Sequence, residues 1–245
     1  LPSIIAIVLA IGARRMTKRK AIVRELTTTE TLGAVTTIIT DKTGTLTENA
    51  LTVRYISIID EEDITVSGEG WSSEGTFFQR QKPFLLDNST HPIQQLLEIA
   101  SVCTNAVIRY EADTSSYDLL GDPTEGALVV LARKAGREVQ SQQKLDDLPF
   151  DSSLKFRASL YQSDNDLKLF VVGAPETIIE RSHLVLSQEG FKPIAVVKDK
   201  LQQKMNTFAS DAMRVIALAY KGMPKGRGEV VVEDVQELVF VGVVA

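Results

Sequence analysis

The chain is poor in the residues that cross-link small proteins or ligate metals in them. Its 245 residues include one cysteine, Cys103, and only two histidines. A single cysteine cannot form an internal disulfide, and it suits a reducing compartment. These three side chains also leave little material for a zinc site of the usual Cys and His type. A hydrophobic core must therefore hold the fold together, and 44% apolar residues are enough to build one.

The chain also lacks an excess of positive charge. It has 27 Lys and Arg residues against 32 Asp and Glu residues, which gives a net charge of −5. A protein that binds nucleic acid in general relies on a basic surface, so we expect no nucleic-acid partner. The length allows one large domain or two smaller ones.

An apolar run opens the chain and is followed by basic residues. Residues 1–13 read LPSIIAIVLAIGA and would span about 20 Å as a helix, whereas a bilayer core needs about 30 Å. A signal peptide would carry its positive charges first. An apolar segment with basic residues after it is typical of a membrane helix that leaves on the cytoplasmic side. We expect residues 1–19 to be the cytoplasmic half of a transmembrane helix, in contact with lipid. The alternative is the buried start of a soluble domain.

Hydrophobic periodicity predicts an α/β chain. Alternating and β-branched stretches predict strands, and apolar residues at helical spacing predict helices. In the segment DPTE, Asp122 is expected as an N-cap, with Pro123 and Glu125 in the first turn. The predicted strands cover residues 35–40, 51–59, 155–161, 167–172, 215–220 and 238–244, and the predicted helices cover 93–100, 123–135, a short stretch from 175, and 195–212.

The stretch TTIITDKTGTLT, residues 36–47, places a charged pair directly after an apolar run. Ligands of open α/β sheets bind at the carboxyl ends of strands, which is the position predicted for Asp41. A carboxylate there can attack phosphorus and hold the phosphoryl group covalently. Lys42 would offset the charge, and Gly44 would let the backbone approach a phosphate. An Asx turn that ends the strand is the alternative.

The complete heptapeptide DKTGTLT, residues 41–47, resembles the phosphorylation signature of the P-type ATPases. The segment ETLGAVTTIITDKTGTLTENALTV is similar to their type II, calcium-pump-like branch, and GDPTEGAL, PFDSSLKF and GAPE follow in the family's order. The resemblance implies an α+β nucleotide-binding domain, residues 50–236. It would be inserted in a partial haloacid-dehalogenase-like, Rossmannoid phosphorylation domain formed by residues 20–49 and the return strand 237–245. Residues 35–40 and 238–244 would then share one sheet.

The resemblance also implies a function and a set of site residues. Asp41 would take the γ-phosphoryl group of ATP, Lys42 would offset charge beside it, and Asp41 and the backbone carbonyl of Thr43 would hold Mg²⁺. The parent would be an integral membrane pump with cytoplasmic nucleotide-binding and phosphorylation domains. Its cation would be calcium, with magnesium, sodium or potassium as alternatives, and it would be bound outside this chain. The implied ATP contacts are Glu125 and Phe150 at the adenine, Lys155 near the nucleotide, Gly173 and Ala174 in the GAPE segment, and Arg214 at the phosphates.

Three departures from the family pattern bear on activity. Val172 stands where the family usually has a lysine, and neither a Thr-Gly-Asp nor a Gly-Asp-Gly-Val-Asn-Asp motif occurs. We therefore expect weak ATP binding and no turnover by this chain alone, and we expect Val172→Lys to strengthen binding. Two alternatives are a non-catalytic nucleotide-binding module and a soluble haloacid-dehalogenase-like phosphohydrolase. A phosphatase of that fold places an acid–base Asp two residues after its nucleophile, where this chain has Thr43.

Overall fold

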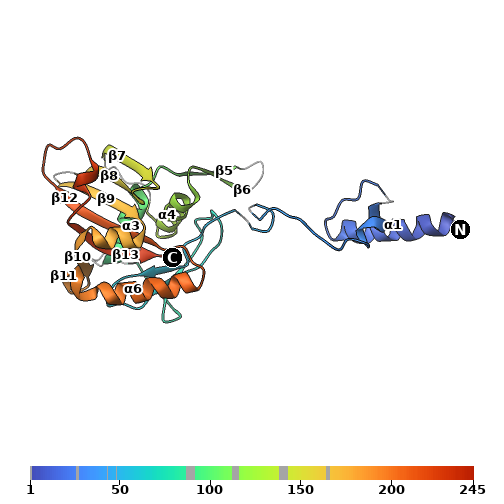
Figure 1. Cartoon of the computed structure of the whole chain (residues 1–245), viewed down its shortest axis with the longest axis horizontal. Helices are drawn as coiled ribbons and strands as arrows, with labels where there is room; N and C mark the ends of the chain where they lie inside the picture. The colour runs from blue at the N-terminus through green and yellow to red at the C-terminus, as the bar shows by residue number, and fades with distance from the viewer. Residues whose placement is uncertain are drawn as a thin grey trace. The chain divides into compact units, whose positions relative to one another are not determined.

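The computed structural model describes residues 2–25, 28–42, 44–47, 49–86, 92–111, 116–137, 143–163 and 166–245. The chain divides into two compact units, Leu1–Asn49 and Ala50–Ala245. Figure 1 labels many of their elements. The helices are α1 (Pro2–Lys18), α2 (Thr28–Leu32), α3 (Pro92–Val102), α4 (Pro123–Lys134), α5 (Pro175–Glu180) and α6 (Ile194–Ser210), with a 3₁₀ turn at Val232–Asp234.

The smaller unit consists of α1, the short helix α2 that contacts it, and an extended tail. The helix expected at the start of the chain is confirmed. Its apolar side chains are exposed, among them Ile4, Ile7 and Val8, each more than half accessible. Within the described residues, no helix combines the length and the apolar character needed to cross a membrane.

The strand predicted for residues 35–40 does not form. These residues are extended and exposed, and Ile39 is 96% accessible. A strand gains stability only when a neighbour satisfies its backbone N–H and C=O groups. The described part of the smaller unit offers no second strand. The β-branched composition alone therefore gives an extended segment, and the prediction of a strand there is wrong.

The larger unit is built on one sheet that is antiparallel except at one strand pair. In its described residues the principal strand order is β4-β3-β2-β1-β13-β12-β9-β8-β7, with β10 parallel to β13 and β11 paired to β10. A separate hairpin joins β5 to β6. The strands are β1 (Tyr55–Ser57), β2 (Ile64–Val66), β3 (Phe77–Gln79), β4 (Lys82–Pro83), β5 (Val107–Glu111), β6 (Ser116–Leu120), β7 (Gln143–Asp151), β8 (Phe156–Ser163), β9 (Asp166–Gly173), β10 (Ser182–Ser187), β11 (Gly190–Pro193), β12 (Ile216–Met223) and β13 (Leu238–Val244).

Helices cover both faces of this sheet. One apolar cluster joins α3 and α4 to one face, and a second joins α5 and α6 to the other; Figure 1 shows α6 and α4 on different sides of the sheet. The apolar run LFVV in β9, residues 169–172, is explained by its burial. Phe170 and Val172 belong to the first cluster, whereas Leu169 and Val171 belong to the second. A strand that is buried on both faces loses the polar alternation of a half-exposed strand.

The assignment of residues 238–244 to a different sheet is also wrong. They form β13, which pairs with β1 and β12 and lies in the middle of the large sheet. Its run LVFVGVV is buried on both faces, and this pattern was mistaken for a parallel strand of a separate domain. Residues 35–40 and 238–244 therefore do not share a sheet, and residues 237–245 belong to the larger unit.

Candidate functional site

Six of the residues expected to contact a nucleotide line one cavity of about 340 Å³ in the larger unit. The cavity lies where the first turn of α4, the turn between β7 and β8, the end of β9 and the loop before β12 meet. These residues stand in separate motifs along the sequence, and the fold brings them together. They are Glu125, Phe150, Lys155, Gly173, Ala174 and Arg214.

The start of α4 is fixed by its cap. Asp122 Oδ1 accepts hydrogen bonds from the backbone N–H groups of Thr124 at 2.7 Å and Glu125 at 3.4 Å, and Pro123 occupies the first turn as predicted. The Glu125 carboxylate takes other partners. It accepts from Asn105 N at 2.7 Å and from Thr104 Oγ1 at 3.3 Å. Its side chain is 16% exposed, and the residue lines the cavity.

A buried arginine that the sequence-based assignment did not include also lines this cavity. Arg157 on β8 is 3% exposed, and its guanidinium donates to the Glu125 carboxylate and to both oxygens of Asp147, at 2.9 Å each. A buried charge is tolerated when it is paired and hydrogen-bonded. The available signal was a charged residue near the start of the strand FRASLYQS, and such a residue is equally typical of a solvated strand face.

Asp147 on β7 is held by several donors. Burial alone would raise the pKa of its carboxyl, but hydrogen bonds from Ser159, Asn105, Arg157 and Lys144 together lower that pKa to about 2. Ser159 Oγ lies 2.5 Å from Asp147 Oδ1, and Asn105 Nδ2 lies 2.8 Å from Oδ2. The carboxylate therefore remains charged at neutral pH beside the buried guanidinium.

Phe150 and Lys155 lie at the exposed rim of the cavity. Phe150 is on β7 and is 55% accessible. A turn follows it, in which Asp151 Oδ1 accepts from Ser153 N at 2.7 Å and Leu154 N at 3.2 Å. Lys155 precedes β8 instead of belonging to it as predicted. It has a φ of 59° and forms a 3.6 Å ion pair with Glu176.

Gly173 and Ala174 bring the end of β9 against the backbone of that turn. Ala174 N donates to Lys155 O at 2.9 Å. A Cβ at Gly173 would lie 2.5 Å from Lys155 O and 2.6 Å from Phe156 Cβ, closer than real contacts allow. Only glycine permits this approach, which places the GAPE segment and the Lys155 turn at one wall of the cavity.

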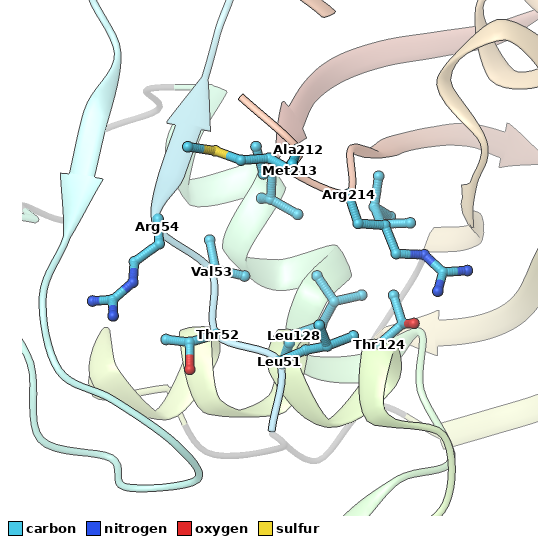
Figure 2. Close-up of a pocket in the computed structure, with 13 residues that line it drawn as sticks. Leu51, Thr52, Val53, Arg54, Thr124, Leu128, Ala212, Met213 and Arg214 are labelled. Atoms are coloured by element: carbon cyan, nitrogen blue, oxygen red, sulfur yellow. The ribbon is translucent and has the colours of Figure 1, made fainter. Parts of the chain in front are cut away.

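Arg214 lies on the loop between α6 and β12 and is exposed. It also lines a second cavity of about 190 Å³, which shares Thr124, Leu128 and Ile216 with the first. Figure 2 shows this second cavity, with Arg214 and Thr124 lying on the opposite side from Arg54. Arg214 thus lines both cavities, and its side chain can approach a ligand in the first one.

The predicted phosphorylation segment lies in the smaller unit. Asp41 and Lys42 are exposed. Lys42 O accepts from Leu46 N at 3.0 Å and from Thr47 N at 3.2 Å, and Gly44 has a φ of 75°. Asp41 is thus followed by a tight turn that leaves its carboxylate accessible. Thr43 lies outside the described residues.

The described residues do not supply a magnesium site by themselves. They contain no group of three or more His, Cys, Asp or Glu side chains placed to hold a metal ion. Of the two predicted magnesium ligands, Asp41 and the backbone carbonyl of Thr43, only Asp41 lies among the described residues. The expected ligand set of Asp41 and Thr43 therefore has no geometry here that would define a bound ion.

Comparison with known proteins gives consistent matches. A family model described as "P-type ATPase, cytoplasmic domain N" matches residues 92–245. A calcium-transporting ATPase of Bacillus subtilis is 33% identical over 99% of this chain and 27% of its own length. A calcium-transporting ATPase of Listeria monocytogenes is 34% identical over 100% of this chain and 26% of its own. A cation-transporting ATPase of Synechocystis is 33% identical over 90% and 25%. The chain thus spans about a quarter of the length of these relatives.

Proposed function

Because the chain belongs to the P-type ATPase family, we propose that it is the ATP-binding part of a calcium-transporting pump and carries the pump's phosphorylated aspartate. Transport itself would require segments that correspond to the rest of the relatives' length. The names of the relatives from Bacillus and Listeria support calcium as the cation. The exposed apolar side chains of α1 support membrane lipid as a partner of the pump. The family description, a cytoplasmic domain, supports the cytoplasmic side for the larger unit.

The observation that carries the proposal is the convergence of six predicted contacts on one cavity. Phe150 offers an exposed aromatic ring on which a purine base can stack. Glu125 offers a fixed carboxylate to the amino group of the base. Lys155 and Arg214 are cations at the rim that can approach the phosphates. Each group is of the chemical type that its part of ATP requires.

In the proposed reaction an Asp41 carboxylate oxygen attacks the γ-phosphorus of ATP. A bond forms between that oxygen and phosphorus, the bond from phosphorus to the β–γ bridging oxygen breaks, and ADP leaves with the electron pair. The exposed position of Asp41 and the tight turn after it suit this attack. Mg²⁺ is the ion that such a transfer would use, and it neutralises phosphate charge.

A non-catalytic nucleotide-binding module is the second candidate, since every predicted ATP contact lies in the larger unit, apart from Asp41. Phosphoenzyme formation separates the two candidates. A pump that contains this chain should give an acid-stable, hydroxylamine-sensitive phosphoenzyme from γ-labelled ATP, and Asp41→Asn should abolish it. Label that persists in Asp41→Asn would contradict the assignment of the nucleophile, and no label in the unaltered pump would favour the module.

Phe150→Ala tests the nucleotide site in this chain directly. We expect it to weaken ATP and ADP by similar factors, about tenfold, because base–aromatic stacking is worth about 1 to 3 kcal/mol and both ligands carry the same adenine. Isothermal titration of both nucleotides measures this. Phe191→Ala is the matched control, since Phe191 is 59% exposed on β11 and lies away from the cavity. Unchanged affinity in a folded Phe150→Ala chain would show that the cavity is not the site.

A further inference from the structure

Arg157 is the buried cation of the candidate nucleotide site, and it projects from a strand next to Val172. The two residues are Cα partners across β8 and β9, so their side chains lie on the same face of the sheet. Both line the cavity. Val172 is the position where the resemblance to the family predicts a lysine. The cavity is therefore supplied with a positive charge from β8, directly beside the position on β9 that lacks one.

The guanidinium fixes the orientation of the Glu125 carboxylate. Arg157 donates to Oε1 of Glu125, while Asn105 N and Thr104 Oγ1 donate to Oε2 at 2.7 and 3.3 Å. A carboxylate has about four lone-pair positions, and among the described residues these three donors occupy three of them. One acceptor position remains for a ligand, and its direction is set by the other three bonds.

The same guanidinium separates two carboxylates. Asn105 contacts both Glu125 and Asp147, through its backbone N and its side-chain Nδ2 respectively, so the two acids are neighbours. Arg157 bridges them, and Lys144 lies 3.1 Å from Asp147. Two cations thus balance two anions. Without Arg157, two carboxylates would face one another with one cation left, and the position of Glu125 would no longer be fixed.

We propose that Arg157 is a positioning residue that fixes Glu125 as a single hydrogen-bond acceptor and thereby selects 6-aminopurine nucleotides over 6-oxopurine nucleotides. This inference rests on the proposed function of the cavity. A 6-amino group donates to the remaining lone pair of Glu125. A 6-oxo group presents a second acceptor to that carboxylate and is repelled. The cation that holds the Glu125 carboxylate is Arg157 on β8. The lysine of the family pattern would instead stand on β9, at position 172.

The test compares ATP with inosine triphosphate, which differs in carrying a 6-oxo group. The unaltered chain is expected to prefer ATP by about tenfold or more, the usual effect of one hydrogen bond to a charged group. Arg157→Met should bring this ratio toward one, and Arg157→Lys should give an intermediate ratio, because a lysine keeps the charge but cannot bridge both carboxylates with a planar fork. Isothermal titration of each chain with ATP and with inosine triphosphate gives the two affinities from which its ratio is calculated.

Val172→Lys tests whether a cation at position 172 on β9 can take the place of Arg157 on β8. Added to Arg157→Met, it should restore part of the preference, because the new lysine lies across the strand pair from the lost arginine. Alone, it should not strengthen ATP binding, because it brings a second cation beside Arg157. The sequence predicted stronger binding, because it does not reveal that Arg157 is the cross-strand partner of position 172. Stronger ATP binding by Val172→Lys alone would show that positions 157 and 172 act independently. It would contradict the inference that Arg157 takes the place of a lysine at position 172.

Arg181→Met controls for loss of stability. Arg181 is half-buried, donates to Val235 O at 3.0 Å and packs against the Phe156 ring, but it does not line the cavity. It should lower stability in urea and leave the ATP-to-inosine-triphosphate ratio unchanged. If Arg157→Met does not fold, Arg157→Lys decides the matter. An unaltered chain that binds no ATP overturns the proposed function. An unchanged ratio in Arg157 variants that do bind ATP overturns this inference alone.

Discussion

Asp147 shows how a single residue in the site reverses the ordinary effect of burial. Its side chain is 17% exposed, and desolvation alone would favour the protonated form. Hydrogen bonds from Ser159, Asn105, Arg157 and Lys144 overcome that effect and lower the pKa from 3.8 to about 2. The group therefore binds a proton less readily in the folded chain than in the unfolded chain. Its contribution to stability is present above about pH 4 and is lost as the pH falls from about 4 to about 2.

Asp147→Asn is expected to destabilise the fold by about 2 kcal/mol at pH 7, the free energy that corresponds to this pKa difference. The difference in unfolding free energy between the unaltered chain and the variant should shrink as the pH falls toward 2, because Asp147 is then neutral in both states. Urea unfolding at several pH values measures it. Asp199→Asn, on the exposed surface of α6, should show no such trend. An Asp147→Asn effect that is constant with pH would contradict the role of charge.

At the scale of elements, local signals predicted the helices and the apolar strands β8, β9, β12 and β13, but they failed at residues 35–40 and at β7. Helix α4 needed only its cap and its apolar spacing, and both are visible in DPTEGALVVLA. Residues 35–40 have strand composition but no partner, and they remain extended. Strand β7 was not predicted. Its run QKLDDLPFD is held by pairing with β8, which composition does not reveal.

The site residues also divide into those that a local motif predicts and one that only the strand pairing reveals. Motif order predicted Glu125, Phe150 and Arg214, because each stands in a short segment with a recognisable pattern, and the fold places them around one cavity. Arg157 could not be found this way. Its importance comes from the register of β8 with β7 and β9, which places it against Asp147 and Val172. A long-range pairing is not encoded in the five residues on either side.

At the scale of the whole molecule, the larger unit is closed by its own two ends. Arg54 N and Tyr55 N donate to Ala245 O at 2.8 and 3.0 Å, and Ala245 N donates to Tyr55 O at 3.0 Å. The backbone at the start of the unit and the residue after β13 thus belong to one hydrogen-bonded sheet. The larger unit therefore includes β13, whereas the sequence predicted its end at residue 236.

Residues 50–245 are therefore expected to fold and bind ATP without residues 1–49. The apolar clusters of the larger unit begin at Val53 and include β13, and all six predicted ATP contacts lie within this range. Affinity should match that of the full chain within about twofold, as for sites that act independently. Residues 50–236, the domain as predicted from sequence, should fail to fold, because removing β13 leaves β1 and β12 without their shared neighbour. Cooperative urea unfolding and ATP titration decide both. A stable 50–236 chain would mean that β13 is dispensable, and a large loss of affinity in 50–245 would mean that the smaller unit contributes to the nucleotide site.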